Sequence, residues 1–266
     1  MNKPYDLSLV FPVLNERKNL EILIPEFYEF LNENVDKFEI LIIDDNSTDG
    51  TDKYISDLEY SYENLVYVKR DSENSLPLSI LEGINKAEYK NVAWLDADGS
   101  MHIDAFSKLI YSHRKSPSSV VIGSRFVNGG GYKGMENLEN RTMMKSIFNV
   151  QKSNDSVVGM MLSNLFNKLL SIFYKSDVKD ITSGFIIAPK NQIVKSSFEN
   201  CTYGEYFIYL IANFIEQNIK IIEVGYICET RLHGVSKTAP SLKVLINRGI
   251  PYIIAAIKCR RKIGKN

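Results

Sequence analysis

The feature that most constrains the fold is an alternation of short apolar runs with longer amphipathic segments through the first half of the chain. The apolar runs predict strands at residues 7–13, 38–43, 65–68, 91–95 and 119–122. The segments between them predict helices at 16–32, 48–58, 76–87 and 103–112, because apolar residues recur there at the spacing of one helix face. Strands that are apolar on both faces and alternate with helices predict an α/β fold with a mostly parallel sheet flanked by helices. No Gly-x-Gly-x-x-Gly follows any of these strands, which disfavours the dinucleotide-binding variant.

The second half of the chain is less regular. A glycine-rich loop is expected at 128–134, and 136–155 is polar and poorly periodic, as in a lid or an inserted loop. A strong helix is predicted at 157–174, and its apolar stripe is expected to pack in the core. Its members are Met161, Leu162, Leu165, Phe166, Leu169, Leu170 and Phe173. Further strands are predicted at 184–188 and 219–228, with a helix at 203–216 between them and a final helix at 240–262. We therefore expect one domain over 1–240 and an amphipathic, basic helical tail over 241–266.

Carboxylates follow three of the predicted strands. Asp96 and Asp98 directly follow the strand at 91–95, and residues two apart in an extended segment point to the same side. Two carboxylates on one side repel unless a cation lies between them, and a hard divalent cation that also binds substrate phosphates suits such a pair. Asp44 and Asp45 end the second strand in the same way. Ligands of open α/β sheets bind at the carboxyl ends of the strands, where these side chains are expected.

Each carboxylate taken alone has a simpler interpretation. Asp-x-Asp-Gly is also a turn sequence, Glu16 suits a helix N-terminus, and Asp49 suits an N-cap. The joint arrangement at neighbouring strand ends predicts a site for a cation and a nucleoside diphosphate.

Composition excludes some classes of function and partner. The 32 basic and 32 acidic residues balance, so no overall field favours nucleic acid. The three cysteines are widely spaced and contain no Cys-x-x-Cys, which fits a reducing compartment rather than a disulfide framework or a zinc site. No signal peptide and no run of about 18 apolar residues is recognisable, so a cytoplasmic protein is expected. A basic C-terminus after the apolar pattern of 242–257 leaves two alternatives open, namely a helix on the inner face of the membrane or a core-docked helix with a solvated end.

At this point the chain resembles the family 2 glycosyltransferases of the GT-A fold. The motifs that carry the resemblance are Pro12 to Glu16, Ile43 to Thr51 and Leu95 to Asp98. Three later motifs, Gly123 to Arg125, Asp180 to Phe185 and Arg231 to Lys237, resemble the dolichol-phosphate mannose synthase branch, which includes bacterial polyprenyl-phosphate sugar transferases. The motifs occur in the expected order over about residues 7–237.

The resemblance implies roles at the matching positions. The residues implied to bind the nucleotide are Pro12, Leu14, Glu16, Ile43, Asp45, Asp96, Ala97 and Asp98. Asp96, Asp98 and Ser100 are implied to hold Mg²⁺ or Mn²⁺. Together with Asp98, three cationic residues are implied to act in catalysis by contacting the donor diphosphate or the acceptor phosphate, namely Arg125, Arg231 and Lys237. Their chemistry fits, because a guanidinium forks onto phosphate oxygens and a lysine adds a point charge.

The sequence departs from the branch at several positions. Asn74 to Ser79 replaces a glycine-rich turn, with only Gly83 matching, and Ile186 and Thr230 stand where arginine and aspartate are usual. The departure at the turn leaves the identity of the donor open, and the other two lie on the acceptor side. A second acceptor-side cation is not fixed either: Arg141, Lys145 and Lys152 are the candidates.

The sequence thus predicts a metal-dependent, inverting glycosyltransferase that moves a hexose from a nucleotide-sugar to a polyprenyl phosphate at the cytoplasmic membrane face. An anionic phosphate acceptor needs positioning rather than a strong base, and no histidine is an evident base. Three alternatives remain: a transferase acting on a glycan hydroxyl in capsule or lipopolysaccharide assembly, a non-catalytic nucleotide-binding GT-A fold, and a nucleotidyltransferase. The last is disfavoured because no Gly-x-x-x-x-Gly-Lys loop is present.

Overall fold

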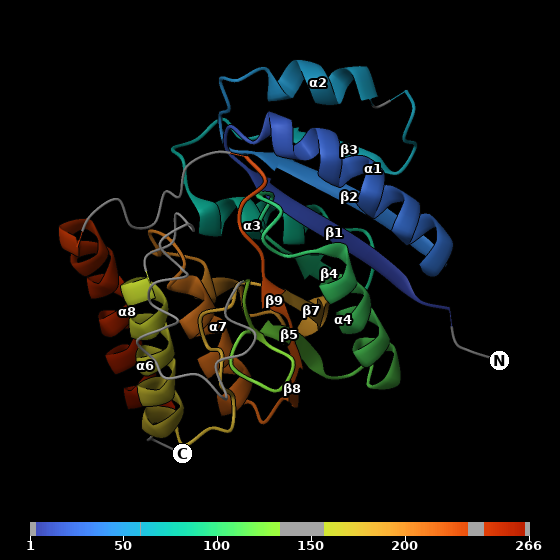
Figure 1. The fold of residues 1–266 in the computed structure, drawn as a ribbon. Helices are drawn as coiled ribbons and strands as arrows, with labels where there is room; N and C mark the ends of the chain where they lie inside the picture. Colours follow the sequence, from blue (N-terminus) through green and yellow to red (C-terminus); the bar gives the residue numbers. More distant parts are fainter. Residues whose placement is uncertain (1–3, 59, 134–156, 234–241, 264–266) are drawn as a thin grey trace.

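A seven-stranded sheet lies between two layers of helices (Figure 1). The computed structural model describes residues 4–58, 60–133, 157–233 and 242–263. Its strands are β1 (Asp6–Val13), β2 (Lys37–Asp44), β3 (Leu65–Lys69), β4 (Asn91–Trp94), β5 (Val120–Ser124), β6 (Gly131–Tyr132), β7 (Ile186–Pro189), β8 (Ile221–Gly225) and β9 (Ile227–Cys228). Its helices are α1 (Arg17–Asn34), α2 (Thr51–Leu58), α3 (Leu76–Lys86), α4 (Ile103–Lys115), α6 (Val157–Tyr174), α7 (Tyr206–Glu216) and α8 (Leu242–Ile263), with short 3₁₀ turns at Lys190–Gln192 and Lys195–Ser197.

The strand order β3-β2-β1-β4-β7-β5-β8 makes one continuous sheet. All the neighbouring pairs are parallel except those of β7, which is antiparallel to β4 and to β5. The carboxyl ends of the other six strands therefore lie along one edge. The mostly parallel sheet predicted from the sequence is confirmed, and the reversed β7 was not predicted.

Alternation along the buried strands separates two hydrophobic cores. Leu9 and Phe11 of β1 belong to the core beneath α1, α2 and α4, whereas Val10 between them belongs to the core beneath α3, α6, α7 and α8. Close approach of α3 to β1 requires a glycine at position 83, because a Cβ there would lie 2.4 Å from Val10 Cγ1. This explains the one glycine that matches the family's pattern in this region.

Most of the predicted elements are present within a few residues of the expected bounds. The apolar run 219–228 is two strands rather than one, since β8 joins the main sheet and β9 pairs with β6 in a separate two-stranded ribbon. The glycine-rich loop therefore contains a short strand, β6. The segment 136–155, expected as a lid or an inserted loop, lies outside the described residues.

The prediction that the apolar stripe of α6 packs in the core is wrong for most of its members. Leu170 is buried and Phe166 is partly buried. The remaining members are exposed on the outer side of the helix: Met161, Leu162, Leu165, Leu169 and Phe173. The sheet-facing side of α6 is instead completed by Met160 and Tyr174 together with the polar residues Asn167 and Ser171.

The final helix is docked on the protein by one side and apolar on the other. Ala255, Ala256 and Cys259 of α8 are buried in the core, and Tyr174 donates a hydrogen bond to the Ala256 carbonyl at 3.2 Å. The opposite side exposes Ile250, Ile253, Ile254 and Ile257. Pro251 lies within this helix, which is assigned as continuous from Leu242 to Ile263. Within the described residues, no helix is long and apolar enough to cross a membrane.

A buried histidine links α4 to Tyr5, the residue before β1, and makes the free energy of unfolding depend on pH. His113 is fully buried, its Nδ1 lies 2.8 Å from the Tyr5 hydroxyl, and burial lowers its pKa to about 4. The unfolded chain, with a histidine pKa of about 6.5, binds this proton first as the pH falls. The stabilising contribution is therefore complete above about pH 6.5 and is lost progressively toward pH 4, up to about 3 kcal/mol.

Urea unfolding of the wild type and of His113→Gln between pH 7 and 4 measures this contribution. We expect the difference in unfolding free energy between the two proteins to shrink steadily as the pH falls. His102→Gln is the matched control, because the His102 side chain is 52% exposed. Parallel pH profiles for the wild type and His113→Gln would contradict the assignment.

Candidate functional site

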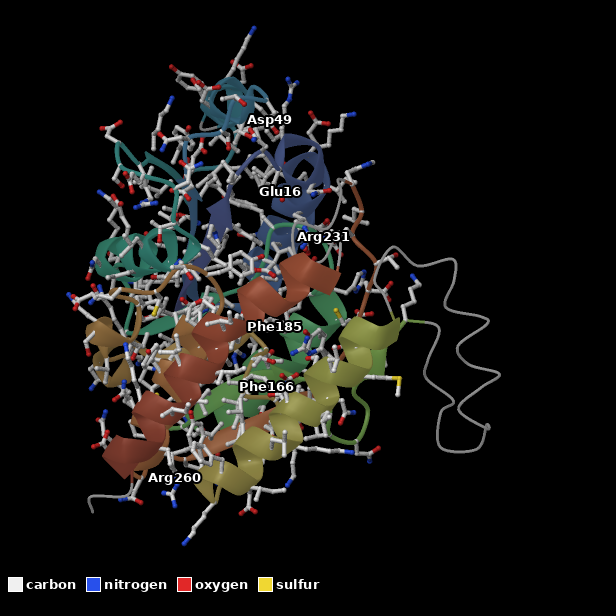
Figure 2. All side chains as sticks on the ribbon, turned by 90° about the vertical axis from the view of Figure 1, so that its left-hand side faces the viewer. Glu16, Asp49, Phe166, Phe185, Arg231 and Arg260 are labelled. Atoms are coloured by element: carbon white, nitrogen blue, oxygen red, sulfur yellow. The ribbon has the colours of Figure 1, made fainter. Side chains whose placement is uncertain are left out.

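A pocket opens at the carboxyl edge of the sheet, where β1, β2 and β4 end. Most of the residues predicted to bind the nucleotide line it: Pro12, Leu14, Glu16, Asp45, Asp96, Ala97 and Asp98. Arg231 lies more than 130 positions after Asp98 in the chain but lines the same pocket. Figure 2 shows it beside Glu16. The sheet thus brings the strand-end carboxylates and one of the predicted arginines together.

Asp44 does not line the pocket but holds neighbouring residues in place by hydrogen bonds. The residue is fully buried, and its two carboxylate oxygens accept hydrogen bonds from Ser47 N at 2.8 Å and from the Tyr67 hydroxyl at 2.6 Å. Burial and the Asp44 carboxylate both raise the pKa of Tyr67, so the phenol stays protonated as a donor. Asp49 has a comparable role, since it accepts from the backbone N–H groups of Thr51 and Arg17 at the starts of α2 and α1. Asp49 is one residue before the N-cap position of α2, which Gly50 occupies, so its interpretation as the N-cap is wrong by one position, although it does bond the helix start.

Asp45 reaches the pocket and is held by a cation that sequence analysis missed. Its Oδ1 accepts from Arg70, a buried arginine just after β3, and its Oδ2 accepts from Ser75 N at 2.6 Å. Arg70 also donates to the Ser72 and Ser79 hydroxyls, so its guanidinium is fixed by several partners. No motif marked Arg70 in the sequence; a lone arginine after a strand gives no signal until its carboxylate partner is known.

The Asp96–Asp98 loop is covered by the segment that carries Arg231. Glu229 N donates to the Ser100 carbonyl at 2.9 Å, and Leu232 N donates to the Asp98 carbonyl at 3.0 Å. Gly99, at φ +80°, makes this crossing possible, because a Cβ there would lie 2.5 Å from Leu232 Cγ and Cδ1. The crossing brings Arg231 Nη2 to 3.0 Å from Asp98 Oδ2.

Charges in this corner of the pocket are strongly coupled. Burial, followed by the neighbouring charge of Asp98, raises the pKa of Asp96 to about 7. Burial acts to lower the pKa of Arg231, but the charges of Asp98 and Asp96 raise it above its usual value. The Arg231 charge therefore acts on both carboxylates, and the pKa of Asp96 stays raised in spite of it.

This donor set fits a divalent cation that also binds a substrate. Among the described residues, no group of three His, Cys, Asp or Glu side chains is placed to hold a metal alone. Asp96 and Asp98 supply two carboxylates, and Mg²⁺ and similar ions are commonly held by one or two carboxylates with substrate phosphates and water completing the shell. Ser100 is buried and donates its backbone N–H to Asp98 Oδ1 at 2.9 Å, so it orients that carboxylate.

Part of the pocket lining comes from the loop before α7. Thr202 and Tyr203 line the pocket, and neither was identified from the sequence. Glu205 fixes them, since its carboxylate accepts from Thr202 N, Thr202 Oγ1 and Tyr203 N at 2.5, 2.8 and 2.9 Å. Both Glu205 carboxylate oxygens are therefore engaged by this loop.

Arg125 lies beside the pocket in a network of its own. Its Nε and Nη2 donate to the two oxygens of Asp180 at 2.8 Å each, and its backbone N–H donates to the same carboxylate at 2.9 Å. Burial acts to lower the pKa of Arg125, but the charge and hydrogen bonds of Asp180 raise it well above its usual value. Nη2 also donates to Thr182 Oγ1, which accepts from Asn167 of α6.

The remaining predicted site residues lie elsewhere. Ile43 is fully buried in the core against α3 and does not line the pocket. Lys237 and the three candidates for a second acceptor-side cation, Arg141, Lys145 and Lys152, lie outside the described residues. His102 and His233 are both exposed: His102 caps α4 by accepting from Asp104 N, and the His233 carbonyl accepts from Asn19 Nδ2 at 3.4 Å.

Comparison with known proteins identifies relatives of the same kind. The family model described as glycosyl transferase family 2 matches residues 8–187. A dolichol-phosphate mannosyltransferase of Pyrococcus furiosus is 27% identical over 234 residues, which is 87% of this chain. A dolichyl-phosphate beta-glucosyltransferase (ALG5A) of Trichomonas vaginalis is 32% identical over 131 residues, or 46% of this chain. The matches cover 58% and 41% of these two relatives, so the chain spans about half of their length.

Solved structures share the fold. Glucosyl-3-phosphoglycerate synthase of Mycobacterium tuberculosis, in complex with Mn²⁺, UDP and phosphoglyceric acid, superposes with a TM-score of 0.65 over 96% of this chain and 78% of the synthase chain at 14% identity. The same enzyme with Mg²⁺ and UDP gives a TM-score of 0.60 at 15% identity, over 96% of this chain and 79% of that one. These likenesses confirm the predicted GT-A fold, and the names of the two relatives match the branch that the sequence motifs resemble.

Proposed function

The chain belongs to glycosyl transferase family 2, and from this premise we propose that it transfers a hexose from a nucleotide-sugar to a polyprenyl phosphate. The observation that carries the proposal is the pocket in which Glu16, Asp45, Asp96, Asp98 and Arg231 meet at the carboxyl edge of the sheet. Both curated relatives are named for transfer to dolichol phosphate, which supports a lipid phosphate as the acceptor.

The donor side of the pocket suits a nucleoside diphosphate. Glu16 and Asp45 would present carboxylates to the hydroxyl and N–H groups of a nucleoside, and the ion pair with Arg70 keeps the Asp45 carboxylate oriented. Asp96 and Asp98 would hold Mg²⁺ or Mn²⁺ on the diphosphate, where the cation stabilises negative charge on the departing phosphate. Arg231 adds a guanidinium on the same side, at 3.0 Å from Asp98. With a cation held by Asp96 and Asp98, the positive charge of Arg231 would add to the stabilisation of the diphosphate.

The transfer step requires little acid–base chemistry. An oxygen of the acceptor phosphate attacks the anomeric carbon from the face opposite the leaving group, the bond to the donor phosphate breaks, and its electron pair stays on the nucleoside diphosphate. This displacement inverts the anomeric configuration. A phosphate acceptor is already an anion at neutral pH, so positioning and charge stabilisation suffice. In the described part of the chain no histidine lines the pocket, which supports an acceptor that needs no base.

One assay tests the reaction, the donor and the acceptor together. The protein is incubated with Mn²⁺ and a panel of radiolabelled nucleotide-sugars, with and without short-chain polyprenyl phosphate, and the label extracted into organic solvent is counted. We expect label in the organic phase only when both the lipid phosphate and the cation are present. Hydrolysis of the donor without lipid labelling would overturn the lipid acceptor and favour a glycan hydroxyl. No turnover of any donor would favour a non-catalytic fold.

Lys237→Ala tests the acceptor side. Lys237 follows Arg231 in the motif, and a charge-assisted hydrogen bond from it to a phosphate would contribute roughly 1.5–3 kcal/mol, so kcat/KM for the lipid phosphate should fall by about tenfold or more. Lys220→Ala is the matched control, because Lys220 is exposed directly before β8, at the opposite end of the sheet. Unchanged kinetics in Lys237→Ala would remove this lysine from the site.

A further inference from the structure

Helices α6 and α8 lie side by side and together expose an apolar surface (Figure 2). They contact each other through the Phe166 and Tyr252 rings, whose centroids are 6.4 Å apart, and through the hydrogen bond from Tyr174 to Ala256. We call their outward side the α6–α8 face. Its exposed apolar residues are Met161, Leu162, Leu165, Leu169, Ile172 and Phe173 of α6 with Ile250, Ile253, Ile254 and Ile257 of α8.

Most of the exposed large apolar side chains among the described residues lie on this face. Ile172 is 75% exposed, and Leu165 and Leu169 are each 55% exposed, although the same helix has polar residues turned inward at Asn167 and Ser171. Contiguous apolar patches of this kind mark interaction sites in soluble folds. Helix α6 therefore turns polar residues toward the protein and apolar residues outward, whereas a surface helix that faces water does the opposite.

The charged residues of α6 and α8 indicate what kind of partner this face binds. Neither helix contains an Asp or Glu, whereas their sequences include seven basic residues: Lys168, Lys243, Arg248, Lys258, Arg260, Arg261 and Lys262. Because the whole chain has a net charge of zero, the remainder carries −7. Lys168 and Lys258 are exposed, and the Arg260 guanidinium lies 5.8 Å from the Phe173 ring at one end of the face (Figure 2).

An apolar helix surface with only basic charges matches an anionic lipid surface. Leu, Ile and Phe side chains would enter the boundary between headgroups and acyl chains, and lysine and arginine side chains would remain with the anionic headgroups. A second copy of this chain is a poorer partner, because two acid-free basic faces would be brought together. We infer that the α6–α8 face docks the protein on the surface of an anionic lipid bilayer.

The inner sides of the same helices contact the site, so docking would place the pocket at the lipid surface. Asn167 of α6 donates to Thr182 Oγ1 at 2.8 Å and accepts from Ile181 N at 2.7 Å, next to the Arg125–Asp180 pair. Tyr252 of α8 packs on Gly204, where a Cβ would lie 2.2 Å from its hydroxyl, beside the pocket residue Tyr203. That the bound lipid layer also supplies the acceptor rests on the proposed function; the docking itself does not.

Vesicle co-sedimentation tests the inference directly. The full chain is mixed with vesicles of phosphatidylcholine alone or of phosphatidylcholine with phosphatidylglycerol, at low and high salt. We expect binding to the anionic vesicles that weakens with salt. The double variant Ile172→Asp/Ile254→Asp should lower the partition coefficient by about tenfold or more, because two apolar side chains are replaced by charges repelled from the surface.

Ile22→Asp is the matched control, since Ile22 on α1 is 44% exposed and Ile254 is 45% exposed. We expect it to bind like the wild type, and circular dichroism checks that all variants are folded. A second variant, Lys168→Gln/Lys258→Gln, should reduce the preference for anionic over neutral vesicles. Wild-type protein that stays in the supernatant with both vesicles would overturn the inference. So would a solution dimer, seen by sedimentation velocity, that Ile172→Asp/Ile254→Asp dissociates.

Transfer to a detergent-dispersed short-chain polyprenyl phosphate separates this inference from the proposed function. The Ile172→Asp/Ile254→Asp variant should retain that transfer while losing vesicle binding. Vesicle binding through the α6–α8 face without transfer to any lipid phosphate would overturn the proposed acceptor alone. Transfer in detergent with vesicle binding that the substitutions leave unchanged would overturn the docking face alone.

Discussion

Replacing Asp98 with asparagine is expected to lower the rate of sugar transfer by about 10³-fold, because charge stabilisation at the leaving diphosphate is the largest contribution to such a reaction. Asparagine keeps the size of the side chain and can still accept from Ser100 N, which bonds Oδ1 at 2.9 Å. The substitution removes the negative charge that pairs with Arg231 and that a divalent cation would need. Transfer is measured as labelled lipid in the organic phase at saturating Mn²⁺.

Two controls separate the loss of the Asp98 charge from an effect on folding. Asp104→Asn makes the same chemical change six residues later, at a carboxylate that is 85% exposed, and should leave transfer unchanged. Thermal unfolding of Asp98→Asn should stay close to that of the wild type, since the loop remains held by the backbone hydrogen bonds from Glu229 and Leu232. The Arg231 charge is also not left uncompensated, because the neighbouring Asp96 carboxylate attracts it and is no longer repelled by Asp98. Transfer by Asp98→Asn at half the wild-type rate or more would refute the proposed cation site.

The sequence predicts the donor half of the fold well because local pattern and global structure agree there. Continuous apolar runs such as Phe38–Ile43 have one stable environment, the interior of a covered sheet. The direction of β7 could not be predicted in this way, because a short apolar run at 184–188 reads the same in either direction. Its reversal depends on the path of the chain through α6, which periodicity does not specify.

The error at α6 has a definite physical source. Helical periodicity predicts that an apolar side will be covered, but the sequence does not say whether protein or lipid covers it. The side of α6 that packs on the sheet instead carries Asn167 and Ser171, whose polar atoms are satisfied by Thr182, Ile181 and Val178. Apolar periodicity does not predict polar residues at core positions, because their burial depends on hydrogen-bond partners that are distant in the sequence.

The candidate site also contains both residues that could be predicted from the sequence and residues that could not. Glu16, Asp45, Asp96 and Asp98 could be predicted, because each follows a strand and strand ends share one edge. Arg70 and Glu205 could not, because they act through partners 25 and three residues away that no motif connects. Both are positioning residues: Arg70 fixes Asp45, and Glu205 fixes the Tyr203 loop.

Arg125 shows that a motif can mark an important position without specifying what the side chain does there. The resemblance implies contact with a phosphate, yet the guanidinium is engaged by Asp180 through two hydrogen bonds of 2.8 Å, and Asp180 is fully buried. Breaking a buried ion pair from one side leaves an uncompensated charge and costs about 3–5 kcal/mol. Arg125→Met and Asp180→Asn should therefore each destabilise the protein strongly in urea unfolding.

The double variant Arg125→Met/Asp180→Asn separates structure from catalysis. Since neither charge remains buried alone, its unfolding free energy should be well above the value expected from adding the two single losses. The exposed pair Arg17–Glu21 is the control, and Arg17→Met should cost at most about 1 kcal/mol. If Arg125 only supports the fold, transfer should recover together with stability in the double variant. If its guanidinium also contacts the acceptor phosphate, as the resemblance implies, the KM for polyprenyl phosphate should stay raised in Arg125→Met and in the double variant alike, while Asp180→Asn retains an acceptor KM near the wild-type value. Additive losses in unfolding free energy would contradict the buried pair itself.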